Sequence, residues 1–449
     1  MILNFYYPKI CDKLFIDNIN SKIKCSLLYN YAIPSRILTV NTKVLNILRL
    51  CNGKNSVDDI ARKLRIKDSS LHNILEKFRE YNIIDTKSII DDENNYGLTF
   101  WLYMTYSCNL HCKYCFVKKS STKMNIDTAK GVIDKIIDTC KKNNINNAHI
   151  CFGGGEPFLN YNVMKYIVNY SSDNKSNINF SFGVVTNGTL LDDEKIKFIS
   201  DHSFNVLVSL DGIGKHNDKI RHTFDGTGTY DIVINNIKKI KNENISFKIN
   251  YVITDTNIFG VYDFIKFIIK NNYSFNLILE FSYNNDINNI LKHKNRLLKQ
   301  INKSFDLLEK NILNNKYTCI DYNIFWMKMD YPNKFACGAG RNLFGVDCNG
   351  NFCLCSQAID KKIVNFKDND NLLIRSKKIN DEFIFNSNVS NNILCDECRF
   401  RFYCKNGCPV YIKYMNGENP YCFIIRALGD RIIRLYALST YAFSVRNNN

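Results

Sequence analysis

The chain has 449 residues, of which 45% are hydrophobic and 23% are charged. This composition is typical of a globular protein with two or three domains. No stretch approaches the roughly 18 uninterrupted apolar residues of a membrane span, and residues 1–14 lack the basic start and long apolar run of a signal peptide, so we expect no membrane partner.

The formal net charge is +17, and a charge of this sign is compatible with a nucleic-acid partner. The lysines are dispersed among asparagine and isoleucine without a sustained basic run, so a solvated surface is the first interpretation and an acidic peptide partner is the second. Without export, the 18 cysteines indicate metal or catalytic sites in a reducing cytoplasm rather than a disulfide framework.

Residues 1–95 predict a small domain of one strand and three helices. Ala32 to Val40 has the pattern of a strand, and Lys43 to Leu50 that of a helix. A second helix is predicted from Ser56 to Leu64, with Ser56 as its N-cap and Asp59 at the third helical position. A third helix is predicted from Ser70 to Tyr81. This arrangement predicts a winged-helix-like domain.

Residues from about 98 to 281 alternate between β-branched apolar runs and helical patterns. Strands are predicted at Leu98–Tyr106, Ala148–Phe152, Ile178–Val185, Phe204–Leu210, Phe247–Ile253 and Phe275–Phe281. One helix face carries Val132, Ile133, Ile136 and Ile137, and a less regular one carries Ile232, Ile234, Ile237 and Ile240. Strand–helix alternation predicts right-handed units on a parallel sheet, here an α/β fold with a partial (β/α)6 barrel.

Three cysteines follow the first of these strands with the spacing C-x3-C-x2-C: Cys108, Cys112 and Cys115. Three thiolates in one short loop cannot complete a four-ligand site. A 4Fe–4S cluster is normally held by four thiolates, so a triplet leaves one iron open to a small molecule. The alternative is zinc, which prefers paired C-x2-C units and four protein ligands.

Polar and glycine-rich segments follow the next strands, where barrel active sites lie. The second strand is followed by Gly154, Gly155, Glu156 and Pro157, and the third by Thr186 and Asn187. The fourth ends at Ser209 and Asp211, with Arg221 after a polar turn. Each segment taken singly is typical of a turn or a cap. As a set at successive strand ends, they predict a ligand site.

The last part of the chain is rich in cysteine. Cys337 is followed by Gly350 and Cys355, and then come Cys395, Cys398, Cys404, Cys408 and Cys422. A zinc ribbon would use two C-x2-C pairs, and only Cys395 and Cys398 form one. Six further cysteines fit no pattern and are interpreted as small buried apolar residues: Cys11, Cys25, Cys51, Cys140, Cys151 and Cys319.

The cysteine loop resembles the signature loop of the radical S-adenosylmethionine (SAM) enzymes. The resemblance implies that the open iron chelates SAM. Residues 154–157 match the family's GGEP element, which holds the SAM amino group. Positions that contact SAM in the family are matched by Thr186, Asn187, Ser209, Asp211 and Arg221. The tail resembles the SPASM extension of peptide-modifying radical SAM enzymes, which carries two auxiliary 4Fe–4S clusters. By that resemblance one cluster is held by Cys395, Cys398, Cys404 and Cys422. The other is held by Cys337, Cys355 and Cys408, with Cys348 or Cys353 as its fourth ligand.

Residues 47–61 resemble the leader-peptide recognition domain of ribosomal peptide maturases. The expected organisation is therefore a recognition domain at 1–95, a radical SAM barrel at 96–320 and a SPASM domain at 321–449. The resemblance implies three 4Fe–4S clusters, SAM, a ribosomal precursor peptide bound through its leader, and an electron donor such as a flavodoxin or ferredoxin. The implied reaction installs a crosslink in the peptide, most simply a cysteine thioether.

Two alternatives remain open at this point. One is an anaerobic sulfatase maturase; those enzymes carry an aspartate, taken as the general base, directly after the cysteine that matches Cys355, whereas this chain has Ser356. The other is an iron–sulfur redox sensor that binds DNA through the winged helix. Its reader helix has His72, Lys77 and Arg79 but also two glutamates, which is poor for phosphate contact, so no nucleic-acid partner is expected.

Overall fold

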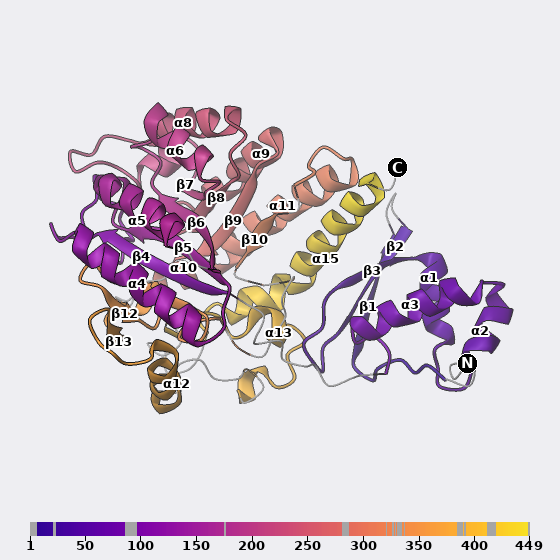
Figure 1. The fold of residues 1–449 in the computed structure, drawn as a ribbon. Coiled ribbons are helices and arrows are strands. Elements are labelled where there is room, and N and C mark those ends of the chain that lie inside the picture. The colour runs from indigo at the N-terminus through magenta and orange to yellow at the C-terminus, as the bar shows by residue number, and fades with distance from the viewer. Residues whose placement is uncertain are drawn as a thin grey trace.

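The computed structural model describes residues 7–20, 24–85, 97–174, 177–280, 287–319, 321–325, 327, 329, 335, 337–383, 389, 392–410 and 419–447. Two sheets organise these residues: a three-stranded antiparallel sheet near the N-terminus and a ten-stranded sheet that forms the body of the molecule (Figure 1). Two of the predicted domain boundaries, near residues 95 and 320, lie outside the described residues.

The front sheet has the strand order β1-β2-β3 and is followed by three helices. Its elements are β1 (Leu14–Asn20), β2 (Lys24–Asn30), β3 (Leu38–Asn41), α1 (Thr42–Leu50), α2 (Val57–Leu64) and α3 (Asp68–Glu80). The three predicted helices are confirmed, and so is the cap of α2, where the Ser56 hydroxyl accepts from the Asp59 amide and the Asp59 carboxylate accepts from the Ser56 amide.

The strand prediction in this region was wrong in two respects. Residues 32–37 are not extended into a strand, since the chain turns at Asn30 and Ser35, whose side chains bond the local backbone. The hairpin of β1 and β2 was missed, although β2 is buried on both faces except at its first residue. A strand buried on both faces has no alternation of apolar and polar residues to reveal it.

The large sheet has the order β10-β9-β8-β7-β6-β5-β4-β11-β12-β13, and its six central strands are parallel neighbours in chain order. They are β4 (Leu98–Thr105), β5 (Asn147–Gly154), β6 (Asn179–Thr186), β7 (Asn205–Ser209), β8 (Phe247–Ile253) and β9 (Ser274–Leu279). These strands confirm the predicted six; Phe281, the last predicted residue, lies outside the described part of the chain.

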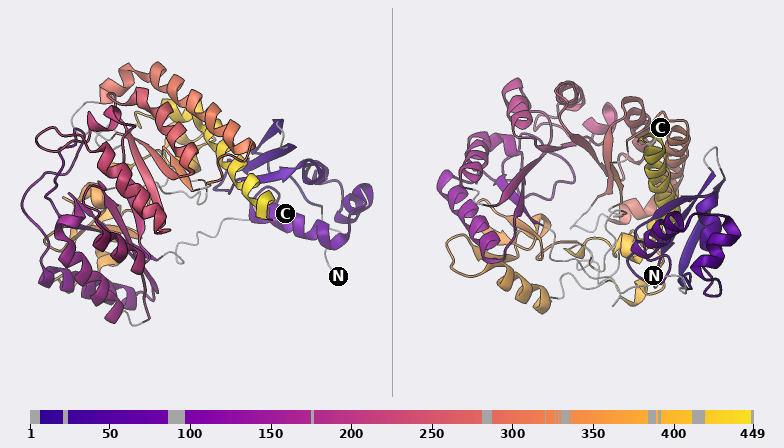
Figure 2. Two further views of the ribbon diagram at one scale, coloured as in Figure 1. Left: turned by 90° about the horizontal axis from the view of Figure 1, so that it is seen from above. Right: turned by 45° about the vertical axis from the view of Figure 1, so that its right-hand side comes forward.

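The large sheet is curved and forms the inside of an open ring (Figure 2). Helices cover the outer face of this sheet. They are α4 (Ile126–Lys142), α5 (Tyr161–Asp173), α6 (Asp193–Asp201), α8 (Tyr230–Asn242) and α9 (Val261–Asn271), with short α7 (Lys215–Asp218), η2 (Pro157–Asn160) and η3 (Ile258–Gly260) at strand ends. The predicted apolar face of α4 is buried. In α8, however, Ile232 is 47% exposed and Val233 takes its place, because positions 233, 237 and 240 follow the helical repeat.

The last third of the chain extends both edges of this sheet. Its elements are α10 (Ile287–Lys292), α11 (Lys294–Leu313), β10 (Tyr322–Ile324), β11 (Leu343–Val346), β12 (Asn351–Cys353), η4 (Ser356–Ala358), β13 (Lys362–Asn365), α12 (Leu372–Phe383), η6 (Ile393–Cys395), α13 (Arg401–Cys404) and α15 (Cys422–Asn447). β10 pairs with β9 and β11 pairs with β4, both in parallel. Strands from the last third of the chain therefore lie on both sides of the six-stranded core.

The front unit packs directly against the tail. The Tyr403 hydroxyl donates to the Ser35 carbonyl at 2.7 Å, and the Arg401 guanidinium donates to the Ala32 carbonyl at 3.0 Å. The ring of Tyr403 meets that of Tyr29 edge-on at 5.5 Å. One face of the front sheet thus belongs to the same buried apolar cluster as α15. Within the described residues, no helix combines the length and apolar character needed to span a membrane.

Candidate functional site

The cysteine loop begins at the carboxyl end of β4 and lies against the end of β5. The Gly155 amide donates to the Thr105 carbonyl at 2.7 Å, and the Glu156 amide donates to the Ser107 carbonyl at 2.9 Å. Two neighbouring parallel strands therefore hold the loop at the edge of the sheet where active sites of such folds are built.

The three thiols of the loop differ in their surroundings. Cys108 and Cys112 are partly buried and Cys115 is exposed. Burial raises the pKa of Cys108 to about 11, and burial also raises the pKa of Cys112 against the opposing charge of Arg221. Thiols with raised pKa values become thiolates when a metal replaces the proton, since metal binding releases it.

Donor groups already point at two of these sulfurs. The Arg221 guanidinium lies 3.7 Å from Cys112 Sγ, the Asn187 side-chain amide lies 3.8 Å from Cys108 Sγ, and the Leu110 backbone amide lies 3.4 Å from the same sulfur. Hydrogen-bond donors of this kind tune the potential of iron–sulfur clusters. Among the described residues, no three His, Cys, Asp or Glu side chains are grouped for a single metal ion. A 4Fe–4S cube binds each thiolate through a different iron, and the three cysteines with donors directed at two of their sulfurs fit such a cluster.

Glycine is required where β5 meets the loop. Gly154 has φ = +112°, a backbone conformation that other residues rarely adopt. A Cβ atom at Gly155 would lie 1.9 Å from the Ser107 carbonyl oxygen. The two glycines therefore permit the close approach of β5 to the cysteine loop, and Pro157 begins the short helix η2 directly after them.

The side chain of Glu156 is fully buried and turned toward β6. Its carboxylate accepts from the Thr186 hydroxyl at 2.9 Å, from the Asn187 amide at 2.8 Å and from the Phe158 amide at 3.3 Å. The resemblance to the GGEP element implies a contact with the SAM amino group. In this structure, the carboxylate joins the ends of β5 and β6, which holds Asn187 beside Cys108.

Glu156 gives the protein a pH-dependent stability. Burial raises the pKa of Glu156 to about 7, whereas an unfolded glutamate has a pKa of about 4.3. Between about pH 4.3 and about pH 7 the folded protein keeps a proton that the unfolded chain has lost. The contribution of Glu156 to the free energy of unfolding is therefore complete below about pH 4 and is lost as the pH rises through 7. The loss approaches roughly 3 kcal/mol. Urea titrations give the free energy of unfolding of Glu156→Gln and of the wild type. As the pH rises from 4.5 to 7.5, we expect the wild type to lose stability relative to the variant. A difference independent of pH would contradict this assignment.

A buried ion pair follows β7. The Arg221 guanidinium donates to the Asp211 carboxylate at 2.6 Å, and both side chains are almost fully buried. The Tyr114 hydroxyl also donates to Asp211, at 2.7 Å, and it accepts from Arg221. Burial holds the pKa of Tyr114 well above its usual value, so the hydroxyl remains a donor. This triad ties the end of β7 to the cysteine loop.

The structure thus brings together the predicted residues from four strand ends. Ser209 is buried at the end of β7 and pairs in register with Asn250 of β8. Sequence reasoning missed two supporting residues, Asn217 and Asn257. The Asn217 side chain accepts from the Asp211 amide, and that of Asn257 donates to the Asp211 carbonyl. Asn217 lies in the short helix α7 and Asn257 directly precedes η3, and neither stands in a spacing that indicates its role.

The tail cysteines fall into two groups. Burial and the neighbouring thiols Cys337 and Cys408 raise the pKa of Cys355 to about 12. Burial and the thiols Cys395, Cys422 and Cys398 likewise raise the pKa of Cys404 to about 12. The assignment of these cysteines to two auxiliary clusters, which the resemblance to the SPASM extension implies, stays a prediction.

The other cysteines of the tail are directed at backbone carbonyls. The Cys348 thiol donates to the Tyr103 carbonyl at 3.2 Å, and the Cys353 thiol donates to the Ile359 carbonyl at 3.0 Å. The choice between them as a fourth ligand stays a prediction. Of the six unassigned cysteines, Cys25, Cys51, Cys140 and Cys151 are buried as expected, whereas Cys11 and Cys319 are partly exposed and contradict that expectation.

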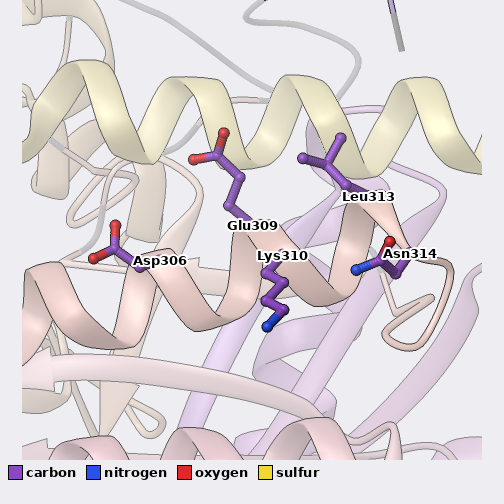
Figure 3. Close-up of a pocket in the computed structure, with 5 residues that line it drawn as sticks. All are labelled: Asp306, Glu309, Lys310, Leu313 and Asn314. Atoms are coloured by element: carbon purple, nitrogen blue, oxygen red, sulfur yellow. The ribbon is translucent and has the colours of Figure 1, made fainter. Parts of the chain in front are cut away.

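A surface pocket lies elsewhere, on α11. It is lined by Asp306, Glu309, Lys310, Leu313 and Asn314. Figure 3 shows Glu309 and Leu313 directed toward α15, where Arg434 donates to Glu309 and Arg431 donates to Asp306. The acidic groups of this pocket are engaged in joining two helices, and the pocket is separate from the strand ends described above.

Comparison with known proteins identifies a domain that contains these strand ends. Residues 102–268 match the Radical SAM superfamily. The chain is 26% identical over 348 residues to a cysteine-type anaerobic sulfatase-maturating enzyme of Clostridium novyi, covering 71% of this chain and 89% of that protein. It is 24% identical over 430 residues to the radical SAM cyclopropyl synthase TigE of Paramaledivibacter caminithermalis, covering 90% and 88%.

A shorter sequence match and a solved structure are also similar to this chain. An uncharacterized protein of Methanocaldococcus jannaschii is 34% identical over 169 residues, and the chain spans 57% of its length. The solved structure of native anSMEcpe with bound AdoMet and Cp18Cys peptide has a TM-score of 0.63 at 20% identity, covering 77% of this chain and 99% of that one; at this identity the match shows the fold. Residues 102–268 are therefore a radical SAM domain, and the chain has homologues among the anaerobic sulfatase maturases and TigE.

Proposed function

We propose that this enzyme modifies a ribosomally made peptide and installs a crosslink, most simply a cysteine thioether. The observation that carries the proposal is the grouping of the tail cysteines into two sets, around Cys355 and around Cys404. The resemblance of the tail to the SPASM extension of peptide-modifying radical SAM enzymes implies that these two sets hold auxiliary clusters. Ser356 occupies the position where sulfatase maturases carry an aspartate, so formylglycine formation is not the reaction we propose.

When bound, the cluster and SAM supply a 5′-deoxyadenosyl radical that abstracts hydrogen from the peptide. The residues of this chain bind and orient these groups. Cys108, Cys112 and Cys115 would hold the cluster, and the side chains of Arg221 and Asn187 are directed at the Sγ atoms of Cys112 and Cys108. Gly154 and Gly155 allow the end of β5 to pack directly against the cysteine loop, because a side chain at either position would clash with the Thr105 or Ser107 carbonyl.

The front unit is the proposed site for the leader peptide. A peptide can bind by adding a strand to an exposed sheet edge, where backbone hydrogen bonds provide affinity. DNA binding is less well supported, because the basic residues of α3 are engaged within the unit. Arg79 pairs with Glu76 and Asp85, and Lys77 pairs with Glu80. A mobility-shift assay with duplex DNA separates the two proposals.

The number of clusters is testable by iron analysis. Ten cysteines match three cluster sites, so anaerobically reconstituted protein is expected to hold about twelve irons, four per cube. Replacing Cys395 and Cys404 by alanine should remove about four of them and leave SAM cleavage intact. Reconstituted protein with only four irons, or with stoichiometric zinc, would exclude the two auxiliary clusters.

The substrate class is testable by mass spectrometry of a cysteine-rich precursor peptide encoded beside this enzyme. We expect a loss of two hydrogens per crosslink in the full-length peptide, and a rate at least about tenfold lower for the same core without its leader. Deleting the front unit is unsuitable, because one face of its sheet is packed in the main apolar cluster. Leader added in trans should inhibit the full-length reaction. Equal rates with and without the leader would show that the front unit does not recruit the peptide.

A further inference from the structure

The side chain of Tyr103, on β4, contacts both the strand ends described above and the cysteine-rich tail. It is buried, and a Cβ atom at Gly154 would lie 3.4 Å from its ring. The centroid of the Tyr103 ring lies 5.6 Å from that of Tyr106, which stands two residues before the cysteine loop begins at Cys108. The Tyr103 hydroxyl donates to the Ser356 carbonyl at 2.8 Å. One side chain therefore joins the end of β4 to the tail.

Cys355 lies between two carbonyls that accept hydrogen bonds from other segments. The Leu354 carbonyl accepts from the Gly340 amide at 3.0 Å, in the turn that follows Cys337. The carbonyl on the other side of Cys355 is the one that accepts from the Tyr103 hydroxyl. The backbone that carries the Cys355 thiol is thus held from one side by the Cys337 turn and from the other side by β4.

A glycine of β11 allows this segment to lie close to the sheet. β11 pairs with β4, and Gly345 stands in register with Trp101. A Cβ atom at Gly345 would lie 2.7 Å from the Cys355 carbonyl oxygen and 3.0 Å from the Ser356 amide nitrogen. The tail therefore crosses β11 at a residue without a side chain and reaches Tyr103 on the neighbouring strand.

We propose that Tyr103 is a positioning residue whose hydroxyl fixes Cys355 relative to the cysteine loop at the end of the same strand. The proposal rests on the proposed function, in which Cys355 holds an auxiliary cluster and Cys108 holds the cluster that binds SAM. Cofactors that act on one peptide need a fixed separation, since a misplacement of about 1 Å costs up to roughly 100-fold in rate. Loosening the backbone at Cys355 also changes the solvent exposure of its cluster, and solvent exposure is one of the factors that set the potential of an iron–sulfur cluster.

The test compares Tyr103→Phe with the matched control Tyr317→Phe in reconstituted enzyme. Both changes remove a buried hydroxyl that donates to a backbone carbonyl, and that of Tyr317 donates to the Tyr273 carbonyl at 2.9 Å. The control lies at the end of a segment, residues 273–317, that contains no cysteine. Phenylalanine keeps the ring beside Gly154, so only the hydrogen bond to the tail is lost. The measurements are iron content, the midpoint potentials of the clusters in a redox titration followed by electron paramagnetic resonance, and the amount of 5′-deoxyadenosine released for each peptide modified.

We expect Tyr103→Phe to hold about twelve irons and to shift the midpoint potential of one auxiliary cluster, whereas Tyr317→Phe keeps the wild-type potentials. The amount of 5′-deoxyadenosine released per modified peptide should rise roughly fivefold in Tyr103→Phe, the factor that corresponds to one net hydrogen bond. Loss of the auxiliary cluster alone, about four irons, would support the same role. Unchanged potentials in Tyr103→Phe, or equal effects of the two variants, would overturn the proposal. Wild-type enzyme that holds only about four irons would instead contradict the proposed function.

Discussion

Replacing Cys108, Cys112 and Cys115 together by alanine is expected to abolish both SAM cleavage and peptide modification. These thiols lie at the strand ends beside Gly154, Gly155 and Glu156, and the proposed function assigns them to the cluster that binds SAM. The measurement is 5′-deoxyadenosine released by dithionite-reduced protein, together with iron content, which should fall by about four.

The control for this prediction is Cys11→Ala/Cys319→Ala. Both residues are partly exposed and lie outside the three cysteine groups described above. We expect the control to keep its iron and its rate of SAM cleavage. If the triple variant released 5′-deoxyadenosine at the wild-type rate, the loop would not hold the cluster that acts on SAM.

The second large effect is expected from Asp211→Ala. This change leaves the Arg221 guanidinium buried without its carboxylate partner, and it removes the acceptor of the Tyr114 hydroxyl and the Val252 amide. Breaking a buried pair in this way costs roughly 3–5 kcal/mol. Urea unfolding of the cluster-free protein measures this loss of stability.

An exposed ion pair offers the matched comparison. Lys197 and Asp201 pair at 3.0 Å on α6 with both side chains largely in solvent. Asp201→Ala is expected to change the unfolding free energy by less than about 1 kcal/mol. Asp211→Asn should lie between the two, because it keeps an acceptor for the Val252 amide. A loss for Asp211→Ala no larger than that for Asp201→Ala would show that the triad does not anchor the cysteine loop.

The amino-acid sequence alone determined the central sheet and the cysteine spacing at its edge. The six parallel strands follow from β-branched runs separated by amphipathic helices, and their order is fixed because right-handed crossovers place consecutive strands side by side. Cysteine spacing is a local property of the chain, so the loop at 108–115 could be recognised without the fold. The capping box of α2 is local in the same sense.

Only the tertiary structure decided which groups meet. Tyr114 and Asp211 are 97 residues apart, and no local pattern predicts that they share Arg221 in a buried triad. The inward turn of Glu156, the grouping of Cys355 with Cys337 and Cys408, and the contact of Tyr403 with Ser35 likewise depend on packing between distant segments. Sequence periodicity reports the environment of a residue through its neighbours in the chain, whereas these contacts are set by the closure of the sheet and by the packing of the tail across the front unit.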